Sequence, residues 1–171
     1  TTLLRLAILS SYFQFLIARD LISRNPVSRV DRPRKPRPQP RSLTQPGIQA
    51  LLRAVPNNRS GRRDRAIIIT GLLTARRKSE VLGLTAGDIE DDGGMVTYRY
   101  RGKGGAVKRR ELPQVAYHAI CDYLGGKPAE VLQPGDRLFP VHPQGFYLNL
   151  QRYLRRAGFT PAGVHMLRHT G

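Results

Sequence analysis

A proline-rich basic segment limits the fold of this chain more than any other feature. Residues 31–41 read DRPRKPRPQPR, with four prolines and five basic residues among eleven positions. Proline fixes φ and has no N–H to donate, so this segment cannot be helical, and we expect an extended, polyproline-like linker. The sequence therefore predicts three parts: residues 1–30, the linker 31–41, and a larger region 42–171.

The charge balance predicts a polyanionic partner. Lys and Arg number 29 against 12 Asp and Glu, a formal net charge of +17. The longest apolar stretch, residues 3–18, is too short and too interrupted by polar residues to span a membrane, so nucleic acid is favoured over a membrane surface. A single cysteine excludes a disulfide framework. In the linker, phosphate contacts are expected from Arg32, Arg34, Lys35 and Arg37.

The first region carries a helix, expected over about residues 3–20, that is apolar on more than one side. Such a helix should be buried against other helices, yet the linker follows almost at once. We therefore expect the chain to begin inside a helical domain, an expectation that agrees with its start at Thr1 instead of Met.

Residues 42–171 predict a mainly α fold with one small antiparallel sheet, an α+β class. A helix is expected after Thr44, which can cap it, and others are expected at 65–75, 78–84, 115–124, 144–157 and from 164 onward. Residues 95–101 alternate as a strand, with 107–112 as the hairpin partner, and residues 88–94 are expected to form a turn-rich loop.

Three clusters could carry chemistry. Arg76 and Arg77 directly follow a buried helix, so at least one guanidinium should lie near the core, and Glu80 can orient Arg77. Lys103 occupies a glycine-rich hairpin tip between basic strands, where the cations are Arg99, Arg101, Lys108, Arg109 and Arg110. His165 and Arg168 share a helical face and can converge on one anion. Taken singly, each also fits a solvated basic surface.

The order of these clusters resembles the tyrosine recombinase (phage integrase) family. The matching sequence runs Arg-x-Ser-Glu, then Gly-Lys-Gly on a hairpin, then His-x-Leu-Arg-His-Thr. The similarity implies a catalytic core over 42–171, preceded in 1–30 by the last part of a helical core-binding domain. It implies metal-free and cofactor-free cleavage and rejoining of double-stranded DNA through a 3′-phosphotyrosyl intermediate.

The resemblance also assigns roles to residues. Arg77 and Arg168 would clamp the scissile phosphate, Lys103 would protonate the leaving 5′-oxygen, and His165 would assist proton transfer. Glu80 would brace Arg77. Ala75 replaces the family's usual Gly, and Met166 replaces its usual Asp.

A further departure concerns the nucleophile. All seven tyrosines precede the His-x-x-Arg motif, whereas the family's attacking tyrosine follows it. We therefore expect a chain truncated at both ends that binds DNA, is monomeric and does not cut. Its full-length parent is expected to act as a homotetramer on DNA in the bacterial cytoplasm, at the nucleoid.

Two other functions stay open at this point. One is a non-catalytic DNA-binding remnant of a mobile element, which still binds DNA but no longer cleaves and rejoins it. The other is a basic RNA-binding protein, which would explain the charge but leave the ordered motifs to coincidence. In the RNA-binding case, Arg77 and Arg168 would matter no more than any other arginine.

Overall fold

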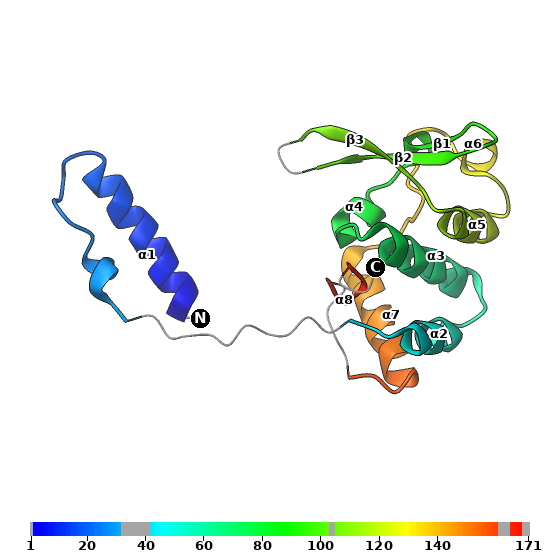
Figure 1. Cartoon of the computed structure of the whole chain (residues 1–171), viewed down its shortest axis with the longest axis horizontal. Coiled ribbons are helices and arrows are strands. Elements are labelled where there is room, and N and C mark those ends of the chain that lie inside the picture. Colours follow the sequence, from blue (N-terminus) through cyan, green and yellow to red (C-terminus); the bar gives the residue numbers. More distant parts are fainter. Residues whose placement is uncertain (1, 32–41, 103–104, 161–164, 169–171) are drawn as a thin grey trace. The chain divides into compact units, whose positions relative to one another are not determined.

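Helix α3 (Arg59–Thr74) lies at the centre of the larger part of the molecule. Its N-cap Asn58 accepts a hydrogen bond from the Gly61 N–H at 2.8 Å, and its apolar residues Ile67 and Ile68 are almost fully buried. Around it pack α5 (Gln114–Leu124), α7 (Pro143–Arg156) and α8 (His165–Arg168) (Figure 1). The computed structural model describes residues 2–31, 42–102, 105–160 and 165–168.

Shorter helices complete this part. They are α2 (Gln45–Ala54), α4 (Lys78–Leu82), the 3-10 turn η2 (Ala86–Asp88) and α6 (Pro128–Val131). As predicted, Thr44 caps α2, where its Oγ1 accepts a hydrogen bond from the Gly47 N–H at 3.4 Å. The α2 helix lies against α7. Most of the core is therefore helix packed on helix.

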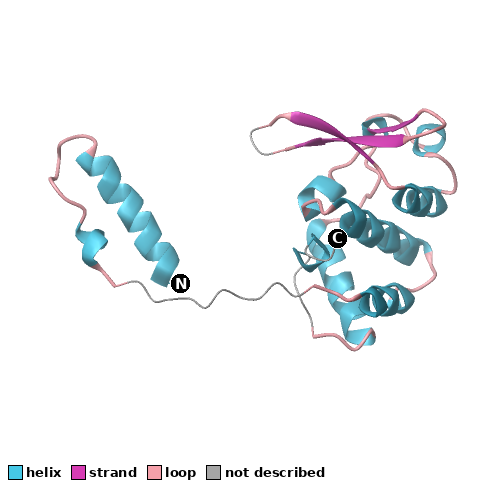
Figure 2. Cartoon of the chain, viewed as in Figure 1, coloured by secondary structure: helices cyan, strands magenta, loops and turns pink. Residues whose placement is uncertain are grey.

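Three antiparallel strands form the sheet, in the order β1 (Ile89–Asp91), β2 (Val96–Arg101), β3 (Val107–Glu111). Figure 2 shows them gathered on one side of the helices. Tyr98 and Tyr100 of the central strand are buried, whereas every residue of the edge strand β3 is exposed. The hairpin was predicted. The loop expected over residues 88–94 was wrong for Ile89–Asp91, because these residues pair with β2 as a third strand.

The fold class is the predicted one, mainly α with a small antiparallel sheet. The chain divides into two compact units, residues 1–39 and residues 40–171. Among the described residues, no helix is both long and apolar enough to cross a membrane.

The first unit contains α1 (Thr2–Ile17) and the 3-10 turn η1 (Pro26–Arg29). Asn25 joins them: its Nδ2 donates to the Ser10 carbonyl at 3.1 Å and its Oδ1 accepts from the Val27 N–H at 3.0 Å. The burial of α1 against helices outside this unit stays a prediction. No α1 residue is buried, and Leu4 and Ile8 are 61% and 60% exposed, because only η1 packs against the helix within this unit.

Candidate functional site

The turn between α3 and α4 presents Arg77. Arg77 is the N-cap residue of α4, and Glu80 in the first turn binds it twice. One carboxylate oxygen of Glu80 accepts from the Arg77 backbone N–H at 3.0 Å, and the other accepts from Arg77 Nη1 at 2.9 Å. The Arg77 side chain stays 49% exposed while that of Glu80 is 12% exposed. The expected Arg77–Glu80 contact is therefore present, and it orients the guanidinium without covering it.

Glu80 stays charged in this arrangement. Its partial burial raises the pKa, but the hydrogen bonds from Arg77 and the charges of Arg77 and Arg76 outweigh burial and hold the pKa of Glu80 below its usual value. A carboxyl with a lowered pKa stabilises the fold above its unfolded pKa and loses this effect as the pH falls. The Arg77–Glu80 contact should therefore be intact at neutral pH and weaken only in acid.

The guanidinium that was expected near the core belongs to Arg76. Arg76 is half-buried, and its Cζ lies 4.4 Å from the ring centroid of Tyr100 on β2. Its Nε donates to the Thr74 carbonyl at 3.0 Å. Two adjacent arginines thus point to different places: one packs on the sheet and the other is presented to the outside.

Ala75 gives this turn its direction. It ends α3 with φ 50° and ψ 28°, the left-handed conformation that costs an L-residue about 1–2 kcal/mol. We predict that Ala75→Gly stabilises the protein by about 0.5–1 kcal/mol, because the relief of this strain exceeds the added entropy of the unfolded chain. The melting temperature should then rise by about 1–4 °C.

Thermal unfolding followed by circular dichroism tests this prediction. The matched control is Ala119→Gly within α5, where glycine should lower the stability by about 0.5–1 kcal/mol. A drop for Ala75→Gly equal to the control would contradict the strain argument.

The β2–β3 hairpin carries the predicted basic residues. Arg99 and Arg101 lie on β2, and Lys108, Arg109 and Arg110 lie on β3; all five are exposed. Arg99 and Arg109 are directly opposite in the register, an unfavourable pairing of like charges. Glu90 of β1 relieves it, with one oxygen 3.6 Å from Arg99 Nε and the other 2.8 Å from Arg109 Nη2.

The remaining hairpin cations are available to a ligand. Within the described part of the chain, Arg101, Lys108 and Arg110 form no ion pair with an acidic side chain. Lys103 lies outside the described residues, between the strands that carry these three cations. The hairpin therefore presents unpaired positive charge on both of its faces, because Lys108 and Arg110 are opposite Tyr100 and Tyr98 whereas Arg101 is opposite Val107.

Glu90 competes with any anion that binds Arg99 or Arg109. We predict that Glu90→Gln increases the affinity for duplex DNA by about three- to tenfold at low salt, because it releases two guanidiniums. The gain should shrink as the salt concentration rises.

Fluorescence anisotropy with a labelled duplex at two salt concentrations measures this effect. Glu111→Gln is the matched control, because Glu111 is exposed on the same sheet and forms no ion pair with a described residue. An equal gain in both variants would show that only the net charge matters.

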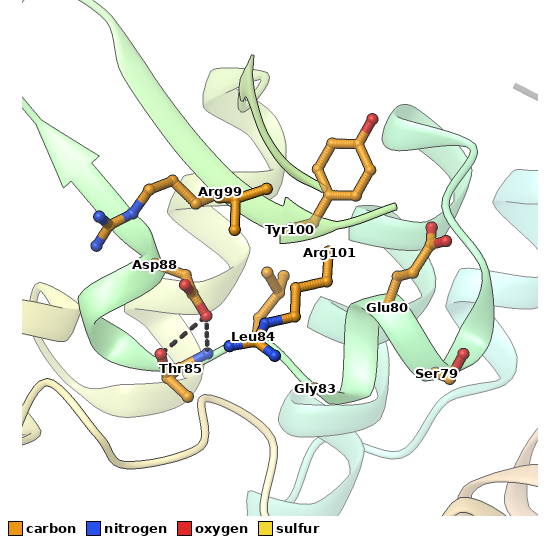
Figure 3. Close-up of a pocket in the computed structure, with 10 residues that line it drawn as sticks. Ser79, Glu80, Gly83, Leu84, Thr85, Asp88, Arg99, Tyr100 and Arg101 are labelled. Atoms are coloured by element: carbon orange, nitrogen blue, oxygen red, sulfur yellow. Dashed lines mark hydrogen bonds between the residues drawn. The ribbon is translucent and has the colours of Figure 1, made fainter. Parts of the chain in front are cut away.

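A pocket of about 580 Å³ lies between β2 and the segment that follows α4. Arg101 extends into it, and Tyr100 points the other way (Figure 3). Asp88 closes one side, where its carboxylate accepts hydrogen bonds from Thr85 N–H at 2.9 Å and Thr85 Oγ1 at 2.8 Å. With Glu80 and Arg99 also in the lining, acidic and basic groups balance, so this pocket favours anions less than the exposed strand β3 does.

Helix α8 contains His165 and Arg168, whose side chains lie outside the described part of the structure. The helix packs on α3 through Leu167, which is buried. Leu167 lies next to Gly71 of α3, where a Cβ would make an ordinary van der Waals contact with Leu167 Cδ1 at 3.7 Å. The segment with His165 and Arg168 thus lies beside the helix that leads into Arg77.

The linker residues Arg32, Arg34, Lys35 and Arg37 lie outside the described residues. Within the described residues, no three His, Cys, Asp or Glu side chains gather as a metal site would require.

Sequence reasoning missed two contributors to this site. The sequence predicted that Arg76 or Arg77 would lie near the core but not which one, and the stacking of Arg76 on Tyr100 had no local signal. Glu90 was placed in a loop, and its contacts with Arg99 and Arg109 depend on the pairing of β1 with β2.

The chain is similar in sequence to proteins of a known family. The model of the phage integrase family matches residues 41–171. The tyrosine recombinase XerC of Herpetosiphon aurantiacus is 32% identical over 181 residues, which cover 97% of this chain and 57% of that protein. XerD of Pseudomonas putida is 29% identical over 173 residues, 94% of this chain and 57% of the relative. The chain thus spans little more than half the length of these relatives.

Solved structures show the same fold. A lambda integrase dimer bound to a COC′ core site matches with a TM-score of 0.69 and 18% identity, covering 96% of this chain and 49% of that one. The XerH recombinase bound to its difH substrate matches with a TM-score of 0.59 and 22% identity, covering 77% and 41%. The family match over most of the chain, supported by the fold, shows that this chain belongs to the phage integrase family of tyrosine recombinases.

Proposed function

We propose that this chain binds duplex DNA as part of a site-specific recombinase that cleaves and rejoins strands through a 3′-phosphotyrosyl intermediate. The observation that carries the proposal is Arg77, a half-exposed guanidinium fixed by Glu80. Glu80 in turn lines one pocket together with Arg101 of the hairpin. The relatives' names and the DNA-bound structural neighbours support the same function.

The proposed chemistry uses four residues. Arg77 and Arg168 bind the non-bridging oxygens of the scissile phosphate, where paired guanidiniums stabilise the additional negative charge of the transition state. A tyrosine oxygen attacks the phosphorus, and the bond from phosphorus to the 5′-oxygen breaks. Lys103 gives its proton to that 5′-oxygen, and His165 assists proton transfer. No metal or cofactor enters these steps.

Four of the seven tyrosines are too buried to suit the attacking role. Tyr98, Tyr100, Tyr117 and Tyr153 are buried. Burial and a hydrogen bond to Asp64 raise the pKa of Tyr153 to about 12, and burial together with Asp91 raises that of Tyr117. A raised pKa makes the phenolate scarcer at neutral pH. All seven tyrosines also precede the His-x-x-Arg motif, whereas the family's attacking tyrosine follows it. We propose on this ground that the nucleophile comes from outside these 171 residues, and that the chain alone binds DNA without cutting it.

The expected partners and location belong to the same proposal. A lambda integrase tetramer bound to a Holliday junction shares this fold, with a TM-score of 0.69. By analogy, we propose that the complete recombinase acts as a homotetramer on DNA, with the present residues monomeric in isolation. The similarity to bacterial XerC and XerD supports action in the bacterial cytoplasm, at the nucleoid. The core-binding identity of residues 1–30 and phosphate contacts from linker 31–41 are further parts of the proposal.

The test combines binding and cleavage on one nicked duplex. The chain is expected to bind the duplex and to form no covalent protein–DNA adduct on denaturing gels. Arg77→Gln should weaken binding more than Arg62→Gln, an exposed arginine near the start of the preceding helix α3. A covalent adduct would refute the assignment of the nucleophile. Equal effects of the two substitutions would instead favour a general basic binding surface.

A further inference from the structure

We propose that Arg76 is a positioning residue that holds together the three segments carrying Arg77, the hairpin and α8. The inference rests on the proposed function, since it concerns how that site is assembled. Arg76 itself is not among the proposed phosphate-binding residues. Its contacts lead inward, to elements that are far apart in the sequence.

The first contact fixes its own turn. Arg76 Nε donates to the Thr74 carbonyl at 3.0 Å, across the left-handed residue Ala75. Thr74 is itself held in place, because its Oγ1 donates to the Thr70 carbonyl at 2.6 Å. The backbone immediately before Arg77 is therefore fixed by Arg76.

The second contact reaches β2. The guanidinium lies over the Tyr100 ring, 4.4 Å from the centroid, and this ring also stacks on Tyr98 with centroids 5.6 Å apart. Two residues after Tyr100, the hairpin turn begins at Gly102, whose N–H donates to the Ala106 carbonyl at 2.9 Å. The stack of Arg76, Tyr100 and Tyr98 therefore fixes the end of β2 from which the hairpin tip extends.

Arg76 also lies close to α7 and α8. Arg76 lines a small cavity together with Gly71 of α3, Phe146 of α7 and Leu167 of α8. Leu167 is buried, and it lies between His165 and Arg168 in the sequence. A guanidinium with one face on a ring and its Nε in a hydrogen bond is poorly placed to bind a phosphate directly, so its role is support of its neighbours.

The test compares Arg76→Leu and Tyr100→Leu with Arg62→Leu, which removes one exposed charge from α3. Two probes report on the chain without DNA. Hydrogen exchange at the Gly102 and Gly105 amides reports on the hairpin, and the methyl signals of the two methionines compare α8 with a distant loop. Met166 lies in α8 and is buried, whereas Met95 is exposed before β2 and serves as the internal control.

Both stack-removing variants should speed exchange at these glycines by about fivefold, the effect of removing one cation–π interaction. They should also shift the Met166 signal but not that of Met95. Tyr100→Phe keeps the ring and should behave as the unmodified chain. Unchanged exchange and an unchanged Met166 signal in Arg76→Leu would overturn the proposal. If Tyr100→Leu fails to fold, Arg76→Leu and Tyr100→Phe still decide the outcome.

DNA affinity separates this role from direct phosphate contact. Positioning predicts that Arg76→Leu, Tyr100→Leu and the double variant all weaken duplex binding by a similar factor. A direct contact predicts that Tyr100→Leu, which keeps the charge, has no effect, and that result would also overturn the proposal. Failure of the unmodified chain to bind DNA would refute the proposed function, and the exchange and methionine signals would still test Arg76.

Discussion

Asp64→Ala is expected to cost about 3–5 kcal/mol of unfolding free energy, the usual loss when one partner of a buried ion pair is removed. Asp64 is fully buried in α3. One of its oxygens accepts from Arg63 Nε at 3.0 Å and Nη2 at 2.8 Å, and the other accepts from Asn149 Nδ2 at 2.8 Å and the Tyr153 hydroxyl at 2.9 Å. Its removal takes away the acceptor of a nearly buried guanidinium and of two polar groups of α7.

A graded series measures this network by urea unfolding followed by circular dichroism. Asn149→Ala and Tyr153→Phe each remove one donor and should cost about 1–1.5 kcal/mol. Asp122→Ala, at an exposed site on α5, is the control and should change stability by less than about 0.5 kcal/mol. A loss below about 1 kcal/mol for Asp64→Ala would show that the network does not join α3 to α7 energetically.

Replacing Arg101, Lys108 and Arg110 together by glutamine should reduce duplex DNA affinity by about a hundredfold at about 0.15 M salt. The slope of log K against log salt decreases by about 0.9 for each phosphate that the protein no longer neutralises, so it should fall by about 2.7. The structure supports this size of effect because all three cations are exposed on one hairpin and no described acidic residue pairs with them.

The matched control removes three exposed arginines at the other end of α3 and on α2. Arg53, Arg59 and Arg62 replaced by glutamine give the same change in net charge. This control should lower the affinity by less than about threefold, because salt screens the attraction between the DNA and charges that lie far from it. Anisotropy titrations at several salt concentrations compare both triple variants. Equal losses and equal slopes would place the DNA elsewhere or make binding depend on net charge alone.

Local patterns predicted much of this fold. The apolar periodicity of 144–157 and the cap at Thr44 depend on residues a few positions apart, and the structure confirms the helices they indicate. The Arg77–Glu80 contact is local too, because a spacing of three places both side chains on one face. The order of motifs was sufficient to identify the family before any geometry was known.

Contacts between residues far apart in the sequence could not be predicted from local patterns. Strand β1 has three residues, ends at Asp91 in an acidic, glycine-rich turn, and exists because it pairs with β2. Asp64 lies in the run Arg-Arg-Asp-Arg, which is typical of an exposed surface. Its burial depends on Asn149 and Tyr153, which are 85 and 89 positions away. Which of Arg76 and Arg77 points inward depends on the left-handed backbone at Ala75, a conformation that alanine rarely adopts.

The open edge of β3 has a consequence for handling the protein. An edge strand with free N–H and C=O groups tends to recruit a strand from another molecule, and repulsion between cations opposes this. On β3 the exposed Val107 is followed by Lys108, Arg109 and Arg110, so electrostatic repulsion keeps two such edges apart. Molar salt strips nucleic acid from a basic protein but screens this repulsion as well. Purification at high salt therefore favours self-association of the chain while it removes DNA.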